Sequence, residues 1–114
     1  MTFEVIPTPD FEKALKSLAK RHRSLKQDIL EFIQSLQNNP FQGDELSPGI
    51  RKIRMAITSK GRGKSGGARV ITYTIVTTQT HIDGYIYLLD IYDKSDYSSV
   101  NTDIIQAKIT QLDL

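Results

Sequence analysis

The apolar residues of this chain repeat at helical spacing before residue 40 and at strand spacing after residue 50. Two helical runs lie within residues 9–20 and 24–38, separated by a short break. From residue 50 onward Ile53, Met55 and Ile57 alternate with polar or small residues, which is the period of a strand with one buried face. A helix pair followed by strands predicts an α+β domain, in which helices pack against a sheet.

Polar residues stand where helix N-caps are expected. Thr8 precedes Pro9, which suits the first helical position. Ser24 is followed three residues later by Gln27, a capping-box pattern. The two helices are predicted to form an αα-hairpin that ends before Pro40. Asn101 is predicted to cap a short last helix, whose apolar face consists of Ile104, Ile105, Ile109 and Leu112.

Four β-prone runs supply the sheet: residues 3–6, 50–57, 69–77 and 85–92. Residues 41–49 show no period and contain glycine and proline, so they are predicted to be a loop. The expected order is β-α-α-β-β-β-α. It implies a mostly antiparallel four-stranded sheet with the helices on one face, in a single domain over residues 1–114.

Composition excludes several classes of protein. The sequence has 114 residues and no cysteine, so it has no disulfide framework, thiolate nucleophile or cysteine-bound metal. Its hydrophobic content of 39% and charged content of 25% are those of a chain that folds in water. The N-terminal residues lack a signal-peptide pattern, so the expectation is a cytoplasmic protein without membrane association.

Positive charge is concentrated in the middle of the chain. Residues 51–69 contain seven lysines and arginines and no acidic residue, although the whole sequence has a net charge of only +2. If the strands on either side pair, Lys52, Arg54 and Arg69 project from one face of the sheet while the apolar residues fill the other. Such a patch favours phosphate or nucleic-acid binding, and a solvated polar face is the alternative.

Glycines within this basic segment imitate a nucleotide-binding motif. Residues 61–66 satisfy G-x-G-x-x-G, but the segment that follows is strand-like, whereas the dinucleotide fold requires a helix there. A P-loop would need a glycine at Thr58. We therefore expect no nucleotide cofactor.

The histidines and the late aspartates also suggest no metal. His22 and His81 lack a second histidine or paired carboxylates at metal-ligand spacing, so both are interpreted as ordinary polar residues. Three further acids, Asp90, Asp93 and Asp96, are interpreted as solvated, or ion-paired with the basic loop, rather than as a divalent-metal site.

Three segments resemble a known family. They are residues 51–54 (RKIR), 59–71 (SKGRGKSGGARVI) and 88–95 (LLDIYDKS). Together they resemble the RelE/HigB-type toxins of bacterial type II toxin–antitoxin systems, in the RelE/ParE superfamily. The resemblance spans residues 50–95, and the preceding αα-hairpin agrees with it in order and length.

The resemblance implies a RelE-like fold and a ribosome-dependent, metal-independent messenger-RNA endonuclease. In that chemistry the 2′-hydroxyl attacks the adjacent phosphorus and a 2′,3′-cyclic phosphate remains. Its expected partners are the ribosome, messenger RNA and a cognate antitoxin of helix-turn-helix type. Carried over by position, the catalytic residues are Lys52, Arg54, Arg69 and Lys94, and the RNA-binding residues are Lys60, Arg62, Lys64, Tyr92 and Tyr97. Which lysine serves as base or acid stays open, and both tyrosines could instead pack in the core.

Two alternatives share the expected fold. A ParE-type toxin would inhibit DNA gyrase by binding, without cleaving nucleic acid. An inactive member would act only as an antitoxin-binding module.

Overall fold

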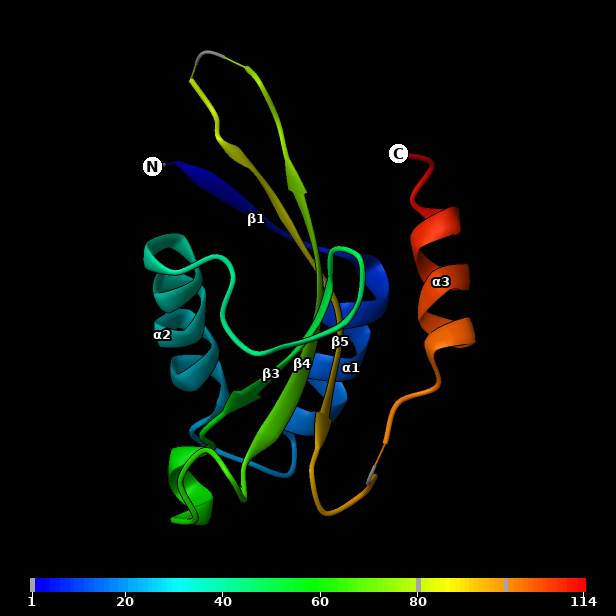
Figure 1. Ribbon diagram of the computed structural model, residues 1–114. Coiled ribbons are helices and arrows are strands. Elements are labelled where there is room, and N and C mark those ends of the chain that lie inside the picture. Colours follow the sequence, from blue (N-terminus) through cyan, green and yellow to red (C-terminus); the bar gives the residue numbers. More distant parts are fainter. Residues whose placement is uncertain (1, 80, 98) are drawn as a thin grey trace.

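A five-stranded mixed sheet runs through the centre of the structure, in the spatial order β1-β5-β4-β3-β2 (Figure 1). This computed structural model describes residues 2–79, 81–97 and 99–114. Its elements are β1 (Phe3–Pro7), α1 (Pro9–Ala19), α2 (Leu25–Asn38), β2 (Asp44–Ser47), β3 (Ile50–Met55), the 3-10 helix η1 (Thr58–Lys60), β4 (Ala68–Val76), β5 (Gly84–Asp93) and α3 (Thr102–Gln111). The α+β class predicted from the sequence is confirmed.

The predicted mostly antiparallel sheet is confirmed, but it has five strands and not four, and one of its pairings is parallel. The expected loop over residues 41–49 contains β2, which pairs antiparallel with β3. Gly49 has a positive φ of 80°, which lets the chain reverse tightly between the two strands. β1 pairs in parallel with β5, from Phe3 opposite Gly84 to Pro7 opposite Leu88.

The αα-hairpin is confirmed, but only one of its two predicted caps forms. The Thr8 hydroxyl accepts a hydrogen bond from the Phe11 N–H and donates to the Leu88 carbonyl, so it caps α1 and joins it to β5. Ser24 does not cap α2 with its side chain. Its hydroxyl donates to Asp28 at 2.7 Å and accepts the Ser59 N–H at 2.9 Å. The capping-box prediction is therefore wrong because a tertiary contact uses the Ser24 hydroxyl.

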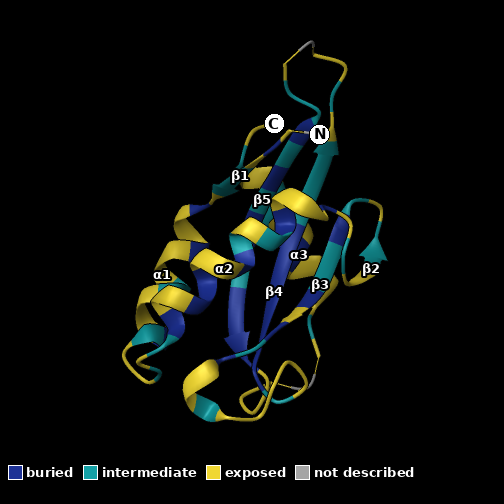
Figure 2. Ribbon diagram, turned by 90° about the vertical axis from the view of Figure 1, so that its left-hand side faces the viewer, coloured by how far each residue is buried: buried dark blue, intermediate teal, exposed yellow. Residues whose placement is uncertain are grey.

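Helices cover both faces of the sheet, and not one as predicted. One apolar cluster joins α1 and α2 to the sheet through residues such as Phe11, Leu25 and Val70. A second cluster on the opposite face joins Ile71 and Leu89 to α3. In Figure 2 the sheet is mostly buried, with exposed helix surfaces outside it.

The predicted apolar face of the last helix is correct except at its first residue. Asn101 caps α3, since its side-chain oxygen accepts the Asp103 N–H at 2.9 Å. Ile105 is buried against the sheet, and Ile109 and Leu112 pack beside it. Ile104 lies outside this face with 56% of its surface exposed.

Candidate nucleic-acid-binding site

Two arginines and a tyrosine form one row across the middle of the sheet. Arg54 of β3 lies opposite Arg69 of β4, and Arg69 lies opposite Tyr92 of β5. Strand alternation places these residues and Lys52 on the α3 side of the sheet, because Ile71 and Tyr92 belong to the cluster beneath α3. Ile53, Met55 and Val70 fill the opposite side. The predicted separation of cationic and apolar faces is confirmed.

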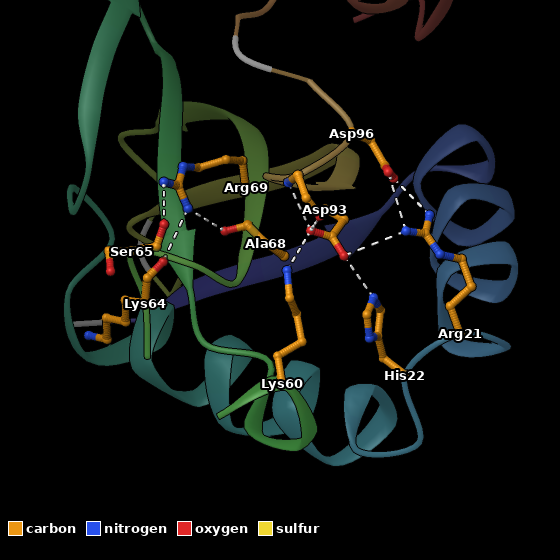
Figure 3. A network of polar contacts seen from close by, with 10 residues as sticks. Arg21, His22, Lys60, Lys64, Ser65, Ala68, Arg69, Asp93 and Asp96 are labelled. Carbon is orange, nitrogen blue, oxygen red and sulfur yellow. Dashed lines mark hydrogen bonds and ion pairs between the residues drawn. The ribbon is translucent and has the colours of Figure 1, made fainter. Parts of the chain in front are cut away.

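The two arginines of this row have different surroundings. Arg54 is exposed, whereas Arg69 is only 7% exposed. The Arg69 guanidinium donates to the carbonyl oxygens of Lys64, Ser65 and Ala68, each at 3.1 Å (Figure 3). These carbonyls face a buried positive charge and satisfy its donors. Arg69 therefore fixes the shape of the loop that follows β3, while Arg54 presents its charge to solvent.

The segment between β3 and β4, residues 56–67, is here named the basic loop. It contains the 3-10 helix η1 near its start. The Thr58 N–H and hydroxyl both donate to the Asp28 carboxylate of α2. Burial favours the neutral form of Asp28, but the hydrogen bonds from Thr58 and Ser24 outweigh it and lower the pKa of this carboxyl below its ordinary value. Asp28 thus anchors the start of the basic loop to α2.

Asp93, the last residue of β5, is the centre of a polar network (Figure 3). Its carboxylate, 1% exposed, accepts the Lys60 ammonium at 2.7 Å and the Ser95 N–H at 2.9 Å, and it lies 2.8 Å from the His22 Nε2 atom. Arg21 approaches it at 3.7 Å. Burial raises the pKa of Asp93, but hydrogen bonds from Lys60, Ser95 and His22 reverse the effect and hold the pKa well below its ordinary value.

This network joins three parts of the fold: the α1–α2 turn, the basic loop and the end of β5. Sequence reasoning did not find Asp93 as a centre, although it included ion pairing with the basic loop among the interpretations of the late aspartates. That interpretation is confirmed for Asp93 through Lys60. Asp96 pairs instead with Arg21 at 2.7 Å. An aspartate at the end of a largely apolar strand was the available signal.

The remaining cations lie around the basic loop. Arg54 and Lys64 line the same cleft, about 180 Å³ in volume, and its lining also includes the acids Asp28 and Glu31 of α2. Arg62 is exposed within the loop. Lys94 is also exposed, and its backbone N–H donates to the Gly67 carbonyl at the end of the loop. These four exposed cations lie on β3, within the basic loop and just after β5, at the end of the sheet that carries the basic loop.

Lys52, Lys60 and Tyr92 are not freely accessible, whereas Tyr97 is. Lys52 is half-buried opposite Asp44 of β2, and Lys60 is held by Asp93 with its side chain 16% exposed. Tyr92 is buried in the cluster beneath α3, so it packs in the core. Tyr97 is 62% exposed and meets Tyr92 edge to face, with ring centroids 5.6 Å apart. Of the two predicted stacking residues, Tyr97 alone presents much of its ring to solvent.

No family model matches the sequence. Across residues 2–79, 81–97 and 99–114, no three histidine, aspartate or glutamate side chains are grouped as metal ligands. Within the same residues, no helix has both the length and the apolar character that crossing a bilayer requires.

Proposed function

We propose that this protein is the toxin of a toxin–antitoxin pair and cleaves messenger RNA on the ribosome. The observation that carries the proposal is that two exposed cations, Arg54 and Lys64, line one cleft. Like charges placed together repel, so a cluster of this kind favours a bound anion. The resemblance of residues 50–95 to RelE/HigB-type toxins favours an RNA phosphate as that anion.

The proposed reaction is an internal displacement at phosphorus. The 2′-hydroxyl oxygen bonds to the adjacent phosphorus as the bond to the 5′-oxygen breaks, leaving a 2′,3′-cyclic phosphate and a 5′-hydroxyl. One group removes the 2′-hydroxyl proton, and another protonates the departing 5′-oxygen. Arg54 stabilises the charge that develops on the non-bridging oxygens. Two exposed lysines supply the proton transfers in this scheme. Lys64 lines the same cleft as Arg54, and the Lys94 backbone contacts the end of the basic loop.

The structure changes the role we assign to Arg69. A buried guanidinium that already donates to three carbonyls has little capacity left for a scissile phosphate. We assign it as a positioning residue, which places Lys64 by binding its carbonyl oxygen. Lys60 is likewise assigned to positioning, through Asp93.

Single-turnover cleavage of messenger RNA on programmed ribosomes tests the proposal. Arg54→Ala is expected to slow the chemical step by about 10²–10³-fold, the loss found when one donor to a developing oxyanion is removed. Lys13→Ala is the control, because Lys13 is an exposed cation on α1, which covers the other face of the sheet. Equal rates for wild type and Arg54→Ala at saturating ribosome concentration would remove Arg54 from the active site.

A second function, binding without cleavage, is favoured by a different observation. Arg69, Lys60 and Tyr92 are all engaged within the fold, which leaves fewer groups for catalysis than the sequence suggested. A gyrase-binding toxin or an antitoxin-binding module would need only the charged surface. Induced expression without an antitoxin distinguishes these functions. New 5′ ends in messenger RNA support the nuclease, inhibited supercoiling supports gyrase binding, and unimpaired growth supports the module.

The proposed partners follow from the same cationic surface. Messenger RNA and ribosomal RNA would bind Arg54, Arg62, Lys64 and Lys94 electrostatically, with each phosphate contact adding about −0.7 to the log–log salt dependence of binding to single strands. A cognate antitoxin would cover this surface with carboxylates or an apolar helix. Co-expression with the product of a neighbouring helix-turn-helix gene tests that partner, and failure to co-purify counts against it.

A further inference from the structure

Half of β5 has a strand on only one side. β1 pairs with β5 from Gly84 to Leu88, and there the chain leaves the sheet, because Thr8 binds the Leu88 carbonyl and starts α1. Residues 89–93 continue to pair with β4. Within the described part of the chain, no strand pairs with their outer edge. An open edge of this kind can accept an added strand.

The ladder between β4 and β5 shows which backbone groups point outward. The Lys94 N–H donates to the Gly67 carbonyl, so residues 94 and 67 form a hydrogen-bonded pair. Bonded and non-bonded pairs alternate in an antiparallel ladder, which places Ile91 and Asp93 in non-bonded pairs with β4. Their N–H and carbonyl groups therefore face the open edge. The Ile91 N–H donates there to the Asp90 side chain at 2.9 Å, and the Asp93 carbonyl accepts the Asp96 N–H.

A cleft of about 510 Å³ lies against this edge. Leu18 of α1 and Ile105 of α3 are among its lining residues, but both are almost wholly buried in the core. Ile104 and Tyr97 also line it, and these are two of the most exposed large apolar side chains of the described residues. The edge is thus accompanied by apolar surface on which the side chains of an added strand can pack.

The charge at the floor of the cleft is negative. Asp93 and Asp96 are engaged by cations of the fold, as described above, but Asp90 has a different environment. The nearby Lys108 ammonium binds Asp10 at 2.8 Å. Burial raises the pKa of Asp90, and the Ile91 N–H and the charge of Lys108 only partly oppose that effect. A cation that enters the cleft can therefore pair with the half-buried Asp90 carboxylate, for which the described residues supply no direct ion pair.

We infer that this cleft is a docking site for an extended segment of another protein. The segment adds to β5 beside Ile91, its backbone accepts the Ile91 N–H in place of the Asp90 carboxylate, and it places a lysine or arginine against that carboxylate. Its side chains pack on Ile104 and Tyr97. An extended segment is required because only its backbone presents donors and acceptors at strand spacing to the edge. The site lies on the β1 side of the sheet, away from Arg54 and Lys64, so it does not depend on RNA cleavage.

The experiment is a ¹⁵N NMR titration of the full chain with the pentapeptide acetyl-Val-Arg-Val-Arg-Val-amide. The largest shifts are expected at the Ile91 and Asp93 amides. The charge-reversed peptide acetyl-Val-Glu-Val-Glu-Val-amide is expected to bind at least about tenfold more weakly. Equal affinity for the two peptides, or shifts that map to β2 and β3 instead, would overturn the inference.

A pair of variants tests the role of Asp90. Asp90→Asn is expected to weaken binding of the arginine peptide about tenfold, as for loss of a charge-assisted contact. Asp44→Asn, an exposed acid on β2 at the opposite edge of the sheet, should leave the affinity unchanged. Sedimentation of each variant accompanies the titration. If Asp90→Asn self-associates and keeps the wild-type peptide affinity, the charge of Asp90 only prevents self-association through this edge, and the docking site is refuted.

Discussion

Replacing Asp93 by asparagine should strongly destabilise this protein, because the buried Asp93 carboxylate is the centre of a network of cations. Asparagine keeps the shape of the side chain but removes the negative charge that Lys60 and His22 contact at 2.7 and 2.8 Å. Lys60 is then left with a side chain only 16% exposed and no counter-charge from β5. The basic loop loses its attachment to β5 at the same time.

The magnitude follows from how deeply the group is buried. Breaking a buried ion pair by removing one partner costs about 3–5 kcal/mol, because an uncompensated charge remains inside the protein. Lys60 retains some contact with solvent, so we expect the lower end, about 3 kcal/mol, for Asp93→Asn. Asp96→Asn is the matched control. Its partner Arg21 is half exposed, and such surface pairs contribute about 0–1 kcal/mol.

Urea unfolding at pH 7 and at pH 3 measures the effect. The pKa of Asp93 is lower in the folded protein than in the unfolded chain, where it is about 3.9. The stabilisation is therefore present above that unfolded value and is lost as the pH falls toward the folded value. The gap in unfolding free energy between wild type and Asp93→Asn should be largest at pH 7 and should narrow at pH 3. The Asp96→Asn variant should track the wild type closely.

Two results would refute this reasoning. One is a gap of equal size at both pH values, which would show that asparagine perturbs packing rather than charge. The other is a cost at pH 7 no larger than that of Asp96→Asn. A double-mutant cycle with Lys60→Met isolates the pair itself, and a coupling free energy near zero would assign the stabilisation to Ser95 and the other contacts.

Three further outcomes follow from contacts in the fold. Asp90→Asn should raise the free energy of unfolding at pH 7 and leave it unchanged at pH 3. The raised pKa of Asp90 means that its ionised form is disfavoured in the folded state, and asparagine removes that ionised form. Urea unfolding at both pH values checks this. Gly67→Ala should cost about 3 kcal/mol in the same assay, because the new Cβ would lie 2.1 Å from the Met55 carbonyl oxygen. Gly63→Ala should cost only about 1 kcal/mol, because the new Cβ would stand in open space and only the positive φ of 63° opposes it. Arg69→Lys should speed tryptic cleavage within the basic loop by releasing its carbonyls, and unchanged cleavage would show that the loop holds its shape without the guanidinium.

The helices were predictable because local chemistry defines them. Thr8 and Asn101 act as caps in the structure as they do in the sequence pattern, and the apolar stripe of α2 faces the sheet. β2 was missed because its pairing depends on the turn at Gly49 and not on any alternation within Asp44–Ser47. The parallel pairing of β1 is likewise a relation between distant segments, and no local period encodes it.

The sequence predicted where the candidate site lies better than it predicted the burial and the partners of each side chain. Strand period placed Arg54 and Arg69 on one face, and the register confirms this. The sequence could not show that Arg69 is buried, because its guanidinium is satisfied by carbonyls of a loop whose shape depends on the whole fold. It could not show that Lys60 meets Asp93 either, since that pair spans 33 residues.

The pairing of the first strand with β5 has a consequence for how the chain reaches its folded state. Thr8 binds Leu88 across 80 residues of sequence, so the parallel pair of β1 and β5 at one edge of the sheet closes a long loop. Closing it costs chain entropy before the contact returns any stability, which makes such topologies slow to fold. During synthesis α1 and α2 emerge well before β5, and until then the apolar face that contains Phe11 and Leu25 has no completed sheet to cover it. A chain truncated before residue 84 should therefore remain unfolded and prone to aggregation, however well its helical hairpin forms.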